Sequence, residues 1–132
     1  MADHDAAMLA FAKLAGLSQD RQQLGPRDKF LILAGTAALR AGWPAVAERC
    51  RELILSHNPR HLIGQSASFA DALRNDDFQV FLRQAEKFCS YEKGEHLLSQ
   101  NDLTPDLPRT SARFSPGEYA LLLLGRGERP NP

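Results

Sequence analysis

The hydrophobic positions along the chain recur with the spacing of α-helices. Between residues 44 and 57, the apolar side chains fall on one helical face: Val46, Ala47, Cys50, Leu53 and Ile54. No segment of the sequence sustains the period-two alternation that is typical of half-buried strands. We therefore predict an all-α fold of antiparallel helical hairpins.

Helix breakers and capping residues place the ends of the expected helices. Gly16 and Gly42 are typical stops, whereas Pro26 and Pro44 suit the first turn of a helix. Ser68, Asn75 and Ser90 are typical N-caps. The sequence predicts a domain over residues 1–101 with five or six helices, at about 5–16, 26–41, 44–57, 69–74, 76–88 and 91–100.

The composition changes after Asn101. Five of the eight prolines lie in residues 105–132, so we expect a proline-rich arm over 102–132. Within it, Ser115, Pro116 and Glu118 form a capping-box pattern before an apolar run, which predicts a short helix near 116–124.

Four consecutive leucines, residues 121–124, make this short helix an aggregation hazard if it is uncovered. The short helix could be covered in three ways. The helix docks on its own domain, inserts into a groove of a partner through Tyr119, Leu122 and Leu123, or exchanges between two identical chains.

The charge balance narrows the functional classes. Sixteen basic and sixteen acidic residues give no net charge, which argues against a nucleic-acid binder. Arg49 and Arg51 alternate with Glu48 and Glu52, which indicates a solvated mixed face. The N-terminal segment lacks a basic secretory n-region, and no apolar run approaches the ~20 residues of a membrane span. We expect a soluble, cytoplasmic domain.

Residues 28–61 resemble a single tetratricopeptide repeat, a family with a period of 34 residues. The matching positions are Leu31, the pair Ala34-Gly35, the turn at Gly42, Ala47 and the closing Pro59. The resemblance implies a tight helical hairpin in which Gly35 and Ala47 let the two helices approach closely. Ala38 and Arg51 stand where the family has aromatic contacts, and no second copy follows 34 residues later.

Two cysteine–histidine pairs offer an alternative chemistry. Cys50 and His57 have the same spacing as Cys89 and His96, which is a rise of about 10 Å along a helix. Neither pair can therefore hold one metal alone, and all four would have to converge. A small metal-dependent or thiol-based enzyme is the alternative hypothesis. His57, in a last helical turn, is otherwise expected to bond free carbonyls.

The favoured hypothesis is a non-enzymatic protein-interaction module, an adaptor or accessory subunit that needs no metal or cofactor. Trp43, in the turn between two helices, is expected to cover the core as a lid, or to be a contact residue if it is exposed. A further alternative is a structural homo-oligomer assembled through the arm. The contact residues that we predict are Trp43, Arg51, Tyr119, Leu122 and Leu123.

Overall fold

The computed structural model describes residues 3–101 and 115–125, and every regular element within them is helical. The all-α prediction is confirmed. None of these helices is long and apolar enough to cross a membrane. The elements are α1 (His4–Asp20), α2 (Leu24–Ala41), α3 (Pro44–His57), η1 (Leu62–Gln65), α4 (Phe69–Ala72), α5 (Asp76–Phe88), α6 (Tyr91–Gln100) and α7 (Pro116–Leu123).

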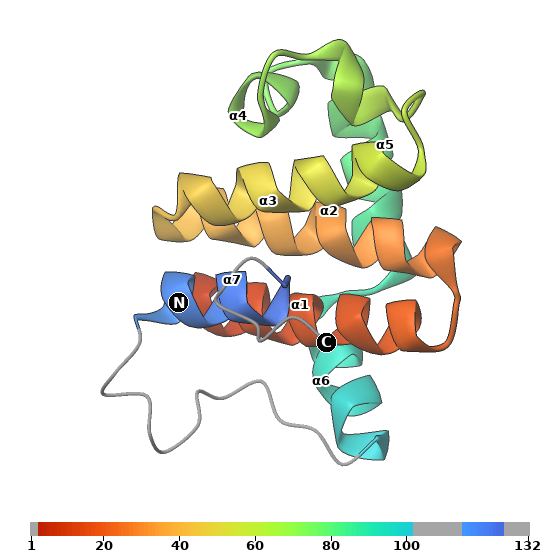
Figure 1. Cartoon of the computed structure of the whole chain (residues 1–132), viewed down its shortest axis with the longest axis vertical. Coiled ribbons are helices and arrows are strands. Elements are labelled where there is room, and N and C mark those ends of the chain that lie inside the picture. The colour runs from red at the N-terminus through yellow and green to blue at the C-terminus, as the bar shows by residue number, and fades with distance from the viewer. Residues whose placement is uncertain (1–2, 102–114, 126–132) are drawn as a thin grey trace.

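The central element is α2, which packs against α1, α3, α4 and α5 (Figure 1). Its residues from Phe30 to Ala38 are all buried, because neighbours cover it on several sides. Gly42 ends the helix in the left-handed conformation, with φ of 87°, and Pro44 opens α3. The predicted turn at Gly42 is confirmed.

The first helix is longer than its sequence predicted. We expected Gly16 to end it, but α1 continues to Asp20. Glycine inside a helix costs only about 0.5–1 kcal/mol, and Ser18, beyond it, is buried among the neighbouring helices. Packing therefore outweighs the glycine. Pro26 is likewise the third residue of α2 and not the first, still within the turn that needs no N–H donor.

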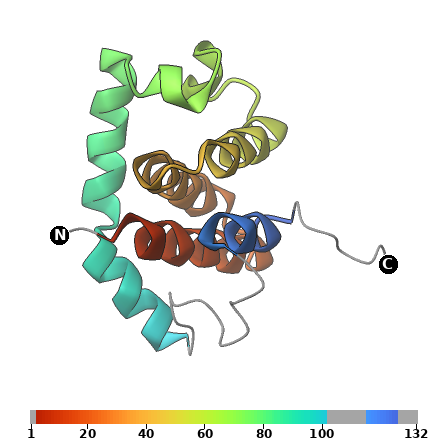
Figure 2. The same cartoon turned by 90° about the vertical axis from the view of Figure 1, so that its left-hand side faces the viewer.

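The short elements after α3 are held by local caps. Ser68, Asn75 and Ser90 each accept a hydrogen bond from a backbone N–H three residues on, as predicted. The start of the short helix at Phe69 is also confirmed, although α4 ends at Ala72. In Figure 2, α5 and α6 line one side of the molecule, and α7 lies away from them beside α1.

Gly35 permits a close approach, but to a different partner from the one expected. A Cβ built on it would lie 2.3 Å from Cε2 of Phe69, and the nearest atoms all belong to that ring. Phe69 is fully buried and belongs to α4. The glycine that the hairpin pattern assigned to the α2–α3 contact therefore makes room for an aromatic ring of α4.

Candidate functional site

The arm helix α7 lies in a groove of its own chain. It packs against α1 and α3 (Figures 1 and 2). Of the three ways of covering its leucines, the structure shows docking on the parent domain. Its predicted capping box is present: the Ser115 hydroxyl accepts from the Glu118 N–H at 3.2 Å, and the Ser115 N–H donates to the Glu118 carboxylate at 3.0 Å. The proline-rich segments 102–114 and 126–132 lie outside the described residues.

Trp43 forms the wall of the groove at the start of α7. Its indole Nε1 donates to Oδ1 of Asp5 at 2.7 Å, so the ring is anchored to the first turn of α1. A Cβ on Gly117 would lie 2.3 Å from Cε3 of Trp43. The side chain is partly buried, and the lid that we predicted for the core covers α7 as well.

The residues of α7 that we predicted as contacts differ in their surroundings. Tyr119 and Leu123 pack against the core, with the Lys13 ammonium 5.7 Å from the centre of the tyrosine ring. Leu122 is partly exposed and is not among the described side chains that pack on the core. The buried hydrophobic residues of the segment are Ala120 and Leu124, at 0% and 6% exposure, and Gly117 is buried as well.

Sequence reasoning did not select Ala120 and Leu124 because it looked for large anchors. The signal was the spacing of Gly117, Ala120 and Leu124, which puts small and apolar residues on one face of a helix. That face is the one that the groove buries.

Arg51, the fifth predicted contact residue, lies at a different place. Its Nη2 donates to the carbonyl of Ser66 at 2.8 Å, and its Nη1 lies 3.8 Å from the Glu48 carboxylate. Glu48 in turn accepts from the backbone N–H of Phe69 at 2.7 Å. The pair therefore ties α3 to the segment between η1 and α4, and these contacts do not bring Arg51 together with the α7 residues.

Arg49, which we expected on a solvated mixed face, reaches α7 instead, and its side chain is only 24% exposed. Nε of Arg49 donates to the carbonyl of Leu124 at 3.2 Å. That carbonyl is one of the groups that a helix end leaves unpaired, and a cation there also favours the helix dipole. Trp43, the N-cap of α3, thus contacts the start of α7, and Arg49, within α3, binds its end.

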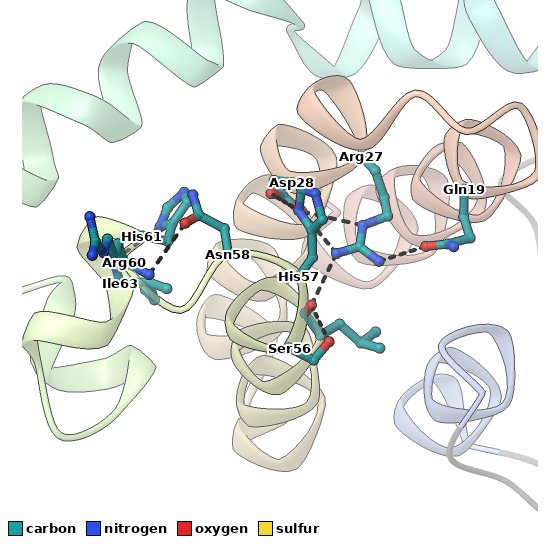
Figure 3. Close-up of polar contacts among 10 residues, drawn as sticks. Gln19, Arg27, Asp28, Ser56, His57, Asn58, Arg60, His61 and Ile63 are labelled. Atoms are coloured by element: carbon teal, nitrogen blue, oxygen red, sulfur yellow. Dashed lines mark hydrogen bonds and ion pairs between the residues drawn. The ribbon is translucent and has the colours of Figure 1, made fainter.

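A buried ion pair stands beyond the end of the groove. Nη2 of Arg27 lies 3.0 Å from Oδ1 of Asp28, and these side chains are 8% and 10% exposed. Arg27 also donates to Gln19 and to the carbonyl of Leu53 (Figure 3). His57 places Nδ1 3.1 Å from Oδ2 of Asp28, so the expectation that it bonds free carbonyls at the end of α3 is replaced by this carboxylate contact.

The cysteines are poor candidates for chemistry. Burial raises the pKa of the Cys50 thiol to about 12, opposed by the charge of Arg49. Burial also raises the pKa of Cys89, opposed by Lys93. A reactive thiol needs the opposite shift. Within residues 3–101 and 115–125, no three His, Cys, Asp or Glu side chains gather where they could hold a metal ion.

Comparison with protein families, with curated proteins and with solved structures finds no match for this chain. The case for its function therefore depends on the groove between α1 and α3 and on the helix that fills it.

Proposed function

We propose that this chain is a non-enzymatic protein-interaction module that binds a short apolar helix between α1 and α3. In the structure that we describe, α7 is the resident occupant of this groove. Binding an amphipathic helix by laying its apolar face in a groove is a recurrent mode of recognition. A partner helix with a glycine at the position of Gly117 would take its place.

The contact between Trp43 and Gly117 carries the proposal. The indole is fixed by Asp5, a residue of α1, so the wall stands on the parent helices and not on the occupant. The 2.3 Å that would separate a Cβ on Gly117 from the ring means that the wall admits a helix only where it carries a glycine. Selection of a small residue by a preformed aromatic wall is a means of specificity.

The occupant is suited to exchange. Eight residues are too few for a helix that is stable alone, since isolated helices below about 12–15 residues are marginal in water. The groove therefore supplies the stability of α7. Each fully buried leucine contributes about 1.5–3 kcal/mol, and a longer or better-matched helix can exceed what α7 buries.

Two further expectations belong to this proposal. The resemblance of residues 28–61 to a tetratricopeptide repeat, a helical hairpin, agrees with the turn at Gly42 and with the end of α3 at His57, before Pro59. A cytoplasmic location agrees with the absence of a membrane-spanning helix among the described residues.

The proposal is tested by freeing the groove in the full chain. In Gly117→Val, the new side chain collides with Trp43 and displaces α7. A fluorescent peptide of residues 115–125 should then bind to the variant at least about tenfold more tightly than to the wild type, measured by anisotropy. Gly25→Ala is the matched control, because its Cβ meets no atom within 4 Å, and this variant should bind the peptide as the wild type does.

The same variant identifies partners. Crosslinking in native lysate should recover a protein with Gly117→Val that is recovered weakly by the wild type and is displaced by the peptide. A self-association that rises in Gly117→Val and is displaced by the same peptide would instead support exchange of α7 between copies. The contrary result is that the peptide binds neither the wild type nor Gly117→Val, although Trp43 fluorescence shows that α7 has left the groove of the variant. In that case the groove is not a helix receptor and the proposal fails.

A further inference from the structure

The groove contacts α7 at both of its ends. At the start, Gly117 lies against the ring of Trp43, where an added Cβ would be 2.3 Å from Cε3. At the end, Nε of Arg49 donates to the carbonyl of Leu124 at 3.2 Å. Trp43 is the N-cap of α3, and Arg49 lies in the second turn of the same helix. The positions of the two contacts are therefore fixed relative to each other.

The spacing of these two contacts matches the length of α7. Trp43 and Arg49 are six residues apart, a rise of about 9 Å along α3. Gly117 and Leu124 are seven residues apart, a rise of about 10.5 Å along α7. The two helices run in the same direction from one contact to the other (Figure 1). The groove is therefore matched to a fixed length of helix, from a glycine to a final carbonyl.

The acceptor of Arg49 is a carbonyl at a helix end. The last residue of α7 is Leu123, and Gly125 has a φ of 79°, the left-handed conformation that is typical after a helix. A helix end leaves its last carbonyls without the N–H groups of a following turn. In a helix that ran on, the carbonyl at the position of Leu124 would accept from the N–H four residues later. Arg49 would then compete with that N–H for one acceptor.

The surroundings of this hydrogen bond add to its effect. Leu124 is 6% exposed, and the side chain of Arg49 is 24% exposed. A carbonyl that is buried without a donor costs free energy comparable to a lost hydrogen bond, and a bond from a charged donor is stronger than a neutral one. The ion pair of Arg49 with Glu52 uses Nη1, at 3.6 Å, and not Nε. Glu52 can therefore hold the guanidinium in place without taking the donor that reaches α7.

We propose that Arg49 is a specificity-determining residue of the groove, which selects a partner helix that ends about two turns after its glycine. This inference rests on the proposed function, since it describes the partner of the same groove. The partner carries a glycine at the Trp43 wall and a left-handed residue, glycine or asparagine, eight positions later, as Gly117 and Gly125 stand in α7. A segment from the middle of a long helix meets the first condition only.

The test compares two peptides of identical composition on the full-length Gly117→Val protein. Both begin with residues 115–124. The early-stop peptide continues with Gly-Ala-Ala-Lys-Ala, and the late-stop peptide, its matched control, with Ala-Ala-Lys-Ala-Gly. We expect the early-stop peptide to bind about tenfold more tightly in fluorescence anisotropy, as a charge-assisted hydrogen bond permits. Circular dichroism of the free peptides should show more helix in the late-stop peptide, so that helicity does not account for this preference.

Arg49→Met, added to the same protein, removes the donor and should reduce the preference for the early-stop peptide to less than about threefold. Arg74→Met is the control variant. Its side chain is 83% exposed and pairs with Asp71 at the surface, so its loss should leave the preference intact. Thermal unfolding checks that both variants are folded.

Two results would overturn the inference while the proposed function stands. In the first, both peptides bind and the late-stop peptide binds as tightly as the early-stop one. In the second, the preference persists in a folded Arg49→Met variant. If Arg49→Met does not fold, the comparison on Gly117→Val alone decides. If neither peptide binds, the proposed function fails, and the inference fails with it.

Discussion

At the scale of single residues, two glycines show how the absence of a side chain allows close packing in this molecule. Gly35 and Gly117 each face an aromatic ring at 2.3 Å from the position of an added Cβ, whereas Gly16 faces open space. The first packs Phe69 into the core, and the second admits α7 under Trp43. The chain therefore uses glycine for close approach at these two contacts.

Gly35→Ala should destabilise the protein by about 1–3 kcal/mol, because the methyl group overlaps the fully buried ring of Phe69. Gly16→Ala should stabilise it by about 0.5–1 kcal/mol, because alanine loses less backbone entropy than glycine on folding. Urea denaturation of both variants measures the two effects. Equal midpoints would show that Phe69 moves freely out of the way.

Asp28→Ala should destabilise the fold by about 3–5 kcal/mol, because it leaves the Arg27 charge buried without its carboxylate. Asp71→Ala is the control. Its pair with Arg74 spans 3.9 Å between side chains that are 50% and 83% exposed, and removing such a pair changes stability by less than about 1 kcal/mol. A small effect of Asp28→Ala on the urea midpoint would contradict the role that we give to the buried pair.

At the scale of elements, α7 depends on its cap. The pKa of Glu118 is lowered from its usual value of 4.5, because the backbone N–H and then the hydroxyl of Ser115 donate to its carboxylate. The ionised form is thus favoured in the capped helix. Its contribution is complete above pH 4.5 and is lost as the pH falls through the lower pKa of the folded state.

Lowering the pH from about 5 to about 3 should therefore loosen α7 and shift the fluorescence of Trp43, the only tryptophan, which lies on Gly117. Glu118→Gln keeps an acceptor for the cap but does not titrate, so its fluorescence should change less over this range. Glu92→Gln, in the first turn of α6, is the control and should follow the wild type. Identical curves for Glu118→Gln and the wild type would disprove this link.

Local signals also explain how much could be predicted from the sequence. The helices, the caps at Ser68, Asn75 and Ser90 and the capping box of α7 depend on residues three or four positions apart. The site does not. Arg49 and Leu124 are 75 residues apart, and Trp43 and Asp5 are 38 residues apart. Helical periodicity says which face of a helix is apolar, but not which distant carbonyl an arginine on it will find.

At the scale of the whole molecule, one continuous core joins α1, α2, α3 and the helices that cover them. Cys50 lies within it at 0% exposure, as does Cys89. The raised pKa of each thiol keeps it protonated near neutral pH. The two cysteines thus report on the opening of the core from two different positions.

At pH 8, iodoacetamide should modify neither thiol of the native protein at the rate of a free cysteine, and both should react together when urea unfolds the chain. Intact-mass spectrometry follows the reaction. In the same protein, a chelator that lowers the thermal midpoint would support the metal-dependent alternative. Selective modification of one thiol in the native protein would support the thiol-based alternative.

The docking of α7 on α1 and α3 sets an order of events during synthesis. Pro116 emerges 59 residues after His57, at the end of α3. At about 5–20 residues per second, this interval lasts on the order of 3–12 s. For that time the growing chain has both walls of the groove but not yet its own helix. The partner helix that we propose would therefore meet no competitor at the ribosome, whereas one that arrives later would have to displace α7.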